Sequence, residues 1–184
     1  MDDIVKAALK KWPNVPDCYR WLALDARGDW YMRDDRIQAA GPFPRVKGSR
    51  IEHDKLKAFI ARNYQADAHG AWHFQNGPQR VYVQLEAAPW VWRVRWPDDT
   101  AAAAPDLSSH TGLAAEVRSC WLDDDGRLYL DTDLGFGIVH SQDMLDAARA
   151  IEQGLWHPQP LDAEAAPQRF GFVRDPQPAD AAQA

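Results

Sequence analysis

Three stretches of this chain share one pattern: an Asp, two further residues, a Gly, and then alternating strand-like residues. They are LDARGDWYM at 24–32, ADAHGAWHF at 66–74 and LDDDGRLYL at 122–130. The last position of a three-residue hairpin loop needs a positive φ, which Gly adopts at little cost. An Asp at the start of the loop can accept a hydrogen bond from the backbone two residues on. The pattern therefore predicts three β-hairpin turns with structural rather than catalytic acids: Asp25 with Gly28, Asp67 with Gly70, and Asp123 with Gly126.

A larger repeat surrounds these turns. A hairpin, a loop and an amphipathic helix occur around 19–64 and again around 116–153. The helices match at Asp54, Leu56 and Ala58 against Asp143, Leu145 and Ala147. This predicts an α+β fold with two related halves, each packing a helix on a mostly antiparallel sheet. The expected parts are an N-terminal half at 1–96, a linker or mobile loop at 97–106, a C-terminal half at 107–175 and a disordered tail at 176–184.

Charge and composition narrow the possible partners and the compartment. The net charge of -6 argues against nucleic acid as a partner, because phosphate backbones require a clustered positive surface. The opening MDDIVKAALKKW does not have the form of a signal peptide, and no segment approaches the ~20 apolar residues that cross a bilayer. Cys18 and Cys120 are expected to be free thiols in a reducing compartment. We therefore expect a cytoplasmic protein with no membrane partner.

The segment 80–96 predicts a further hairpin, with EAAP as its connection. In the register that places all apolar side chains together, the opposite face carries a set of polar residues. We call this set the arginine face: Arg80, Tyr82, Gln84, Arg93 and Arg95. Guanidinium groups suit phosphate or carboxylate, and a Tyr ring can stack on a planar ligand. The face predicts a site for a small anionic ligand, although an ordinary solvated face would have the same composition.

The stretch NGPQRVYVQLEAAPWVWRVR at 76–95 resembles proteobacterial families of unknown function. The resemblance rests on Pro78, on Arg80, on an alternating strand at 81–85, and on the residues Glu86, Ala88, Pro89 and Trp90. It implies a duplicated core and a second domain that is similar to pleckstrin-homology folds. It also implies a site between the domains for a nucleotide-like ligand, with no established activity. The Ala-rich loop at 97–106 and the nine Trp residues depart from the family pattern.

No histidine or cysteine pair has the spacing of a known zinc site, so we expect neither a metal nor a cofactor. The function favoured by the sequence is a non-catalytic binding or regulatory module, with a small anionic molecule held between the two halves. One alternative is a hydrolase that uses His110 or His140 as a base, since separate segments can converge in space. Another is a protein-interaction domain that uses exposed Trp side chains.

Overall fold

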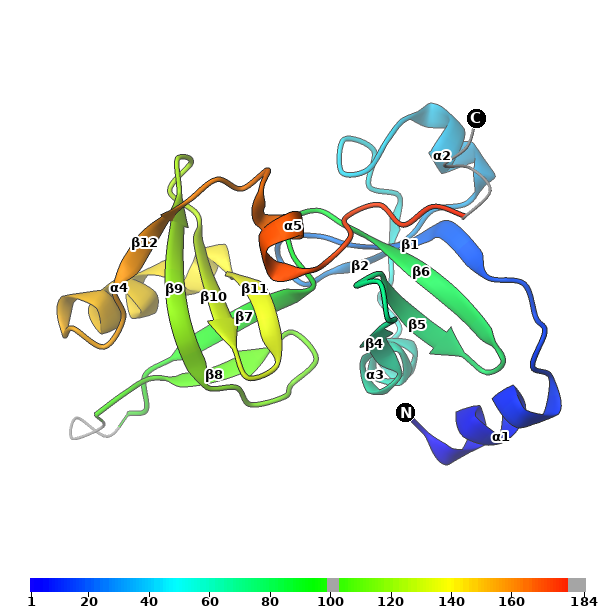
Figure 1. The fold of residues 1–184 in the computed structure, drawn as a ribbon, viewed down its shortest axis with the longest axis horizontal. Coiled ribbons are helices and arrows are strands. Elements are labelled where there is room, and N and C mark those ends of the chain that lie inside the picture. Colours follow the sequence, from blue (N-terminus) through cyan, green and yellow to red (C-terminus); the bar gives the residue numbers. More distant parts are fainter. Residues whose placement is uncertain (99–102, 179–184) are drawn as a thin grey trace. The chain divides into compact units, whose positions relative to one another are not determined.

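The computed structural model describes residues 1–98 and 103–178, which form two compact units (Figure 1). The first unit comprises 1–25, 29–86 and the chain from 171 onward, and the second comprises 26–28 and 87–170. The main boundary thus lies at residue 87, where the sequence predicts it near 97. Part of the expected linker, 99–102, and most of the expected tail, 179–184, lie outside the described residues.

The described residues of the first unit form three helices and a six-stranded mixed sheet. The helices are α1 (Asp3–Lys11), α2 (Asp35–Ala40) and α3 (Asp54–Arg62). The strands are β1 (Cys18–Leu24), β2 (Trp30–Met32), β3 (Ser49–Arg50), β4 (Tyr64–Ala66), β5 (Trp72–Asn76) and β6 (Gln79–Leu85), in the order β3-β2-β1-β6-β5-β4. Helix α3 packs on β5, where Phe59 meets Phe74 edge-to-face at 5.3 Å. That contact places the apolar face of this sheet under α3.

The second unit contains a second six-stranded mixed sheet. Its strands are β7 (Trp90–Arg95), β8 (Asp106–Ser109), β9 (Val117–Asp123), β10 (Leu128–Thr132), β11 (Gly135–Val139) and β12 (Pro158–Leu161). Their order is β12-β9-β10-β11-β7-β8. The 3₁₀ turn η1 (Ser141–Asp143) leads into α4 (Met144–Glu152), which packs on β7, and α5 (Ala166–Phe170) follows β12. Phe170 stacks on Phe136 at 3.8 Å, so α5 contributes to the aromatic core of this unit.

The two halves share a strand arrangement, as the duplicated α+β fold predicts. In each, a three-stranded antiparallel meander (β4-β5-β6 or β9-β10-β11) ends in a strand that pairs in parallel with the first strand of a hairpin (β1-β2 or β7-β8). The turn at Asp67, which joins β4 to β5, is therefore equivalent to the turn at Asp123, which joins β9 to β10. Helix α3 precedes its meander whereas α4 follows its own, so the helices matched in sequence do not occupy equivalent chain positions.

The three repeated turns have the predicted geometry. Gly28, Gly70 and Gly126 have φ values of 82°, 78° and 75°. Each Asp donates its backbone N–H to the carbonyl of the residue four positions later, and its Oδ1 accepts that residue's N–H at 2.8 to 3.0 Å. Each Oδ2 also accepts a Tyr hydroxyl at 3.0 to 3.2 Å, from Tyr31, Tyr82 or Tyr129. The acids therefore hold hairpin tips.

The predicted hairpin of residues 80–96 is wrong. Strand β6 pairs with β5 and β1, and β7 pairs with β8 and β11, in a different sheet. Each strand exists near its predicted bounds because its alternating side chains fix its faces, but each finds distant partners. The segment Glu86–Pro89 is therefore a connection between the units and not a β-turn.

Two segments have local structures that their residue patterns do not indicate. The loop at 33–50 contains α2, whose first turn is capped by Asp34 accepting the N–H of Ile37 at 3.0 Å. The segment RFGFVR at 169–174 alternates like a strand, but its first two residues end α5. After Gly171, with a φ of 68°, the chain returns to the first unit, where Val173 forms an isolated bridge with Ala71.

Candidate binding site

The structure separates the residues of the predicted arginine face. Arg80, Tyr82 and Gln84 lie on β6 in the first unit, while Arg93 and Arg95 lie on β7 in the second. Arg80 and Arg95 are exposed, whereas Tyr82 and Gln84 are buried. The cross-strand register that would have placed Tyr82 beside Arg93 does not exist, because β6 and β7 do not pair.

Gln84 connects two charged residues within the first unit. Its Oε1 accepts a hydrogen bond of 2.6 Å from Arg33 Nη1, and its Nε2 donates to Asp175 Oδ1 at 2.8 Å. Arg33 is only 2 % exposed, and it also donates to the carbonyls of Gly41 at 2.7 Å and Val46 at 3.2 Å. The amide oxygen of Gln84 thus holds Arg33, which in turn holds the 41–46 loop. The amide nitrogen of Gln84 holds the C-terminal segment through Asp175.

Arg93 has a comparable role in the second unit. Its Nε and Nη2 donate to the two carboxylate oxygens of Asp143 at 2.6 and 2.9 Å. Asp143 is buried and also accepts the backbone N–H of Val94 at 3.1 Å. Burial raises the pKa of Asp143, but the hydrogen bonds from Arg93 and Val94 outweigh it and bring the pKa below its ordinary value. The pair fastens η1 to β7.

Tyr82 is the residue of the predicted set that lines a pocket. Its ring stacks on Tyr19 with centroids 4.7 Å apart and an interplanar angle of 6°. The pocket beside them has a volume of about 310 Å³. We call it the tyrosine pocket, and its lining residues are Tyr19, Asp67, His69, Ala71, Tyr82, Val173, Pro176 and Gln177. All of them belong to the first unit.

An irregularity in β1 gives Tyr19 its position. Cys18 and Leu22 of β1 pair with Val81 and Val83 of β6, so β1 carries two more residues than β6 between these partners. Within this bulge, Arg20 has a φ of 66°, the left-handed region that non-glycine residues rarely adopt. Bulges re-aim side chains and left-handed residues often lie at functional sites. Here the bulge places Tyr19 against Tyr82, on the opposite side of β1 from the apolar pocket that Trp21 lines.

The C-terminal segment 171–178 forms a wall of the tyrosine pocket. Val173 donates its N–H to the Gly70 carbonyl at 3.0 Å, and Arg174 offers its carbonyl to the N–H of Leu85 at 2.8 Å. Asp175 accepts from Gln84 and lies 3.8 Å from Arg20. Backbone bonds at two successive residues, followed by the side chain of Asp175, therefore fix this wall on the sheet.

Electrostatics in the tyrosine pocket are dominated by acids. Burial raises the pKa of Tyr82 to about 12, helped by its hydrogen bond to Asp67 and by the charges of Asp67 and Asp17. The pKa of Tyr19 is raised by burial and then by the same two carboxylates, while Arg80 opposes them. Burial also lowers the pKa of His73, a nearly inaccessible residue whose ring lies 5.5 Å from Tyr82. Both tyrosines thus stay protonated hydrogen-bonding groups.

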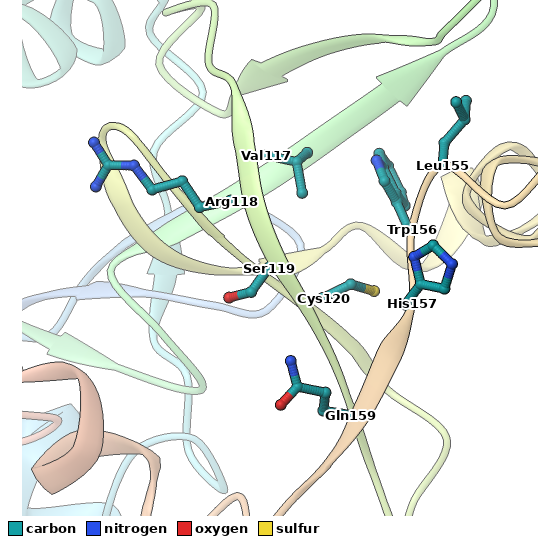
Figure 2. A pocket seen from close by; sticks show the side chains of 8 residues that line it. All are labelled: Val117, Arg118, Ser119, Cys120, Leu155, Trp156, His157 and Gln159. Carbon is teal, nitrogen blue, oxygen red and sulfur yellow. The ribbon is translucent and has the colours of Figure 1, made fainter.

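A second pocket lies where β12 begins beside β9 in the second unit (Figure 2). Its volume is about 230 Å³, and its lining is Val117, Arg118, Ser119, Cys120, Leu155, Trp156, His157 and Gln159. Figure 2 shows the Cys120 side chain directed toward the segment that carries His157, just before β12, with Arg118 extending away from it. Burial raises the pKa of the Cys120 thiol to about 11, so it does not supply a thiolate nucleophile at neutral pH.

A third pocket, of about 240 Å³, lies between α3 and the sheet of the first unit. Its lining is almost entirely apolar and includes Leu22, Ile60 and Phe74, with Asn76 and Gln79 as its polar residues. Trp21 and Met32 also line it and remain 39 % and 47 % exposed. A pocket of this kind offers burial but few groups that would orient a ligand.

His110 and His140, the candidate bases of the hydrolase alternative, both accept hydrogen bonds from backbone N–H groups. His110 Nδ1 accepts the N–H of Val91 at 3.3 Å, and burial lowers the pKa of His110 to about 3. His140 is 5 % exposed, and its Nδ1 accepts the N–H of Gln142 at 3.1 Å, capping η1. In residues 1–98 and 103–178, no cluster of three or more His, Cys, Asp or Glu side chains could hold a metal ion. Nor does any helix in these ranges have the length and apolar character to cross a membrane.

Comparison with known protein families places the chain. The family model DUF2944, described as "Protein of unknown function (DUF2946)", matches residues 1–177. The chain belongs to this family. The match includes the tyrosine pocket, since its lining residues lie between Tyr19 and Gln177. No curated protein matches the chain.

Two crystal structures of DUF1285 family proteins resemble the fold. The one from Shewanella baltica is 16% identical, with a TM-score of 0.46 over 70% of this chain and 91% of the other. The one from Silicibacter pomeroyi is 12% identical, with a TM-score of 0.47 over 76% of this chain and 72% of the other. The family model confirms the expectation, drawn from residues 76–95, that the chain belongs to a family of unknown function.

Proposed function

We propose that this protein is a small-molecule-binding module and that its ligand occupies the tyrosine pocket. The observation that carries the proposal is the bulge at Arg20, which inserts Tyr19 onto Tyr82 beside a pocket of about 310 Å³. A left-handed non-glycine residue costs roughly 1–2 kcal/mol. Such a cost persists where the surrounding structure maintains it, and it is concentrated at functional sites.

The composition of the pocket supports the same proposal. Ligand sites combine an apolar or aromatic lining with a few converging polar groups. The tyrosine pocket has two phenol rings, Ala71, Val173 and Pro176, together with the polar groups of Asp67, His69 and Gln177. It is also larger than the pocket of Figure 2 and the apolar pocket under α3. Of the predicted arginine face, Tyr82 remains in the proposal, because Gln84 and Arg93 are engaged elsewhere and neither Arg80 nor Arg95 lines this pocket.

Ligand-detected NMR with a mixed panel of small aromatic molecules tests the proposal. The panel should contain nucleosides, nucleotides, aromatic amines and aromatic acids, each at millimolar concentration. We expect at least one class to bind the wild type, and Tyr19→Ala to weaken that binding by about tenfold or more, since base–aromatic stacking contributes about 1–3 kcal/mol.

Trp21→Ala is the matched control. Trp21 lies on the same strand, two residues from Tyr19, but it lines the apolar pocket under α3. It should therefore leave ligand binding in the tyrosine pocket within about twofold of the wild type, as for sites without shared contacts. Equal binding by the wild type and Tyr19→Ala, or weakening by Trp21→Ala alone, would contradict the proposal.

A further inference from the structure

The fixed charge around the tyrosine pocket has the opposite sign to that expected from the arginine face. Among the described residues that line it, Asp67 contributes a carboxylate, and no Lys or Arg side chain is present. Asp17 adds a second carboxylate whose charge reaches both tyrosines. An anionic ligand would therefore meet negative charge with no lining cation to pair with it.

The surrounding cations do not reverse this balance. Arg80 lies on the same face of β6 as Tyr82, is exposed, and does not line the pocket. Arg20 lies 3.8 Å from Asp175, so these two charges largely offset each other. Arg33 is buried among Gln84 and two backbone carbonyls. Of the three charges that act on both tyrosines, Asp17 and Asp67 are negative and Arg80 is positive, so together they give the pocket a net negative field.

The aromatic groups add a second, independent preference. The face of a phenol ring is the negative end of its quadrupole and attracts ammonium and guanidinium groups. Tyr19 is only partly buried, and one face of its ring is covered by Tyr82. A partly exposed tyrosine beside a carboxylate is the composition that binds organic cations.

We infer that the ligand of the tyrosine pocket is a small organic cation, an aromatic or aliphatic molecule with an ammonium, amidinium or guanidinium group. This inference rests on the proposed function, because it specifies the ligand class of the same pocket. The cationic group lies toward Asp67, and the apolar part contacts Tyr19, Val173 and Pro176. A cationic ligand is the opposite of the anion that the arginine face predicts from the sequence.

Benzamidine, benzamide and benzoate test the inference, because they share one ring and nearly one shape but differ in charge. Binding is measured by titration calorimetry and ligand-detected NMR at low and high salt. We expect benzamidine to bind more tightly than benzoate by about tenfold or more, an energy of about 1.4 kcal/mol. Salt should weaken benzamidine binding and leave benzamide unchanged, because only the charged ligand is screened.

Variants that change the field without touching the hairpin turn sharpen the test. Asp17→Asn should weaken benzamidine binding by about twofold to fivefold, and Arg80→Gln should strengthen it by a similar factor. Neither should alter benzamide. Asp67→Asn should weaken benzamidine further, and a thermal melt of that variant shows whether the turn has survived.

The outcomes separate the inference from the proposed function. If benzoate binds more tightly than benzamidine and Tyr19→Ala abolishes its binding, the pocket is a ligand site for anions and the inference is wrong. If benzamidine binds equally to the wild type and Tyr19→Ala, it binds elsewhere and the inference is again wrong. If none of the three probes and none of the wider panel binds, the proposed function fails with it.

Discussion

Arg93 and Asp143 form a two-pronged ion pair that joins β7 to the turn η1, with N–O distances of 2.6 and 2.9 Å. About a third of the Arg93 side chain is exposed, whereas Asp143 is almost fully buried. The same carboxylate accepts the N–H of Val94. The sequence predicts that Arg93 binds a ligand, but in the structure Asp143 at the end of η1 holds its guanidinium group.

Replacing Arg93 with Ala should destabilise the second unit. Asp143 would stay buried and keep the hydrogen bond from the Val94 N–H but lose its cation, and breaking a buried pair costs about 3–5 kcal/mol. Because Arg93 is partly exposed, solvent screening reduces this to roughly 2 kcal/mol. Arg95→Ala, on the same strand but exposed, is the control and should change stability by less than about 0.5 kcal/mol. Urea denaturation measures both, and equal midpoints for the two variants would contradict a structural role for the pair.

The contribution of Asp143 should depend on pH with a definite sign. Its pKa in the folded state is lower than its ordinary value of 3.8, so the folded state binds a proton less readily than the unfolded state. The stabilisation is therefore fully present above the ordinary pKa and is lost as the pH falls through the lower, folded-state pKa. The stability difference between wild type and Asp143→Asn should shrink between about pH 5 and about pH 2. A difference that stays constant over this range would show that the charge of Asp143 contributes nothing.

Local chemistry predicted the hairpin turns because each depends on residues within five positions. The Asp supplies an acceptor, the Gly supplies a positive φ, and neither needs a distant partner. The strands β6 and β7 were likewise found near their true bounds, since side-chain alternation marks a strand whatever it pairs with.

The alternation of side chains does not show which strands pair with β6 and β7. β6 joins β1 in parallel across about sixty residues, and no adjacent turn signals such a contact. The arginine face depended on a β6–β7 register, and it was lost with that register. Tyr19 was missed because its role depends on the bulge at Arg20, and nothing in CYRWLAL marks a left-handed residue other than Gly.

The two cysteines should differ in their reaction with thiol reagents. Both are free, but Cys120 is 2 % exposed and burial raises its pKa to about 11. Cys18 is partly accessible, and burial raises its pKa as well. Since the thiolate is the reactive form, Cys18 should be alkylated first in the native protein, and both at similar rates after denaturation. Mass spectrometry of a Cys18→Ser variant identifies the site; rapid native labelling of Cys120 would contradict its burial.

The Arg33–Gln84 hydrogen bond should behave as a coupled pair. Gln84→Leu leaves the buried Arg33 Nη1 without its 2.6 Å acceptor, which costs about 1–3 kcal/mol. Arg33→Met removes a buried charge along with its bonds to two carbonyls. The double variant should therefore be less destabilised than the sum of the single variants, by about 1 kcal/mol or more. Chemical denaturation of all four proteins measures this coupling, and strict additivity would show that the two side chains act independently.

Gly70 and Gly126 occupy equivalent turn positions, and the comparison of their Ala variants isolates a contact that the turn itself does not require. Both have a φ near 77°, so Ala at either position meets the left-handed strain of roughly 1–2 kcal/mol. A Cβ at Gly126 would have no atom within 4 Å, whereas one at Gly70 would collide with the carbonyl oxygen of Gly171. Gly70→Ala should therefore be the more destabilising variant, by about 1–3 kcal/mol, as for other overpacked sites.

Gly70→Ala should also loosen the C-terminal wall of the tyrosine pocket, because Val173 donates to the carbonyl of Gly70 itself. Hydrogen exchange at the amides of Val173 and Leu85 reports that loosening, since both amides donate across this contact. Equal stability losses in the two variants, with unchanged exchange at these amides, would mean that the segment 171–178 does not pack against Gly70 in solution.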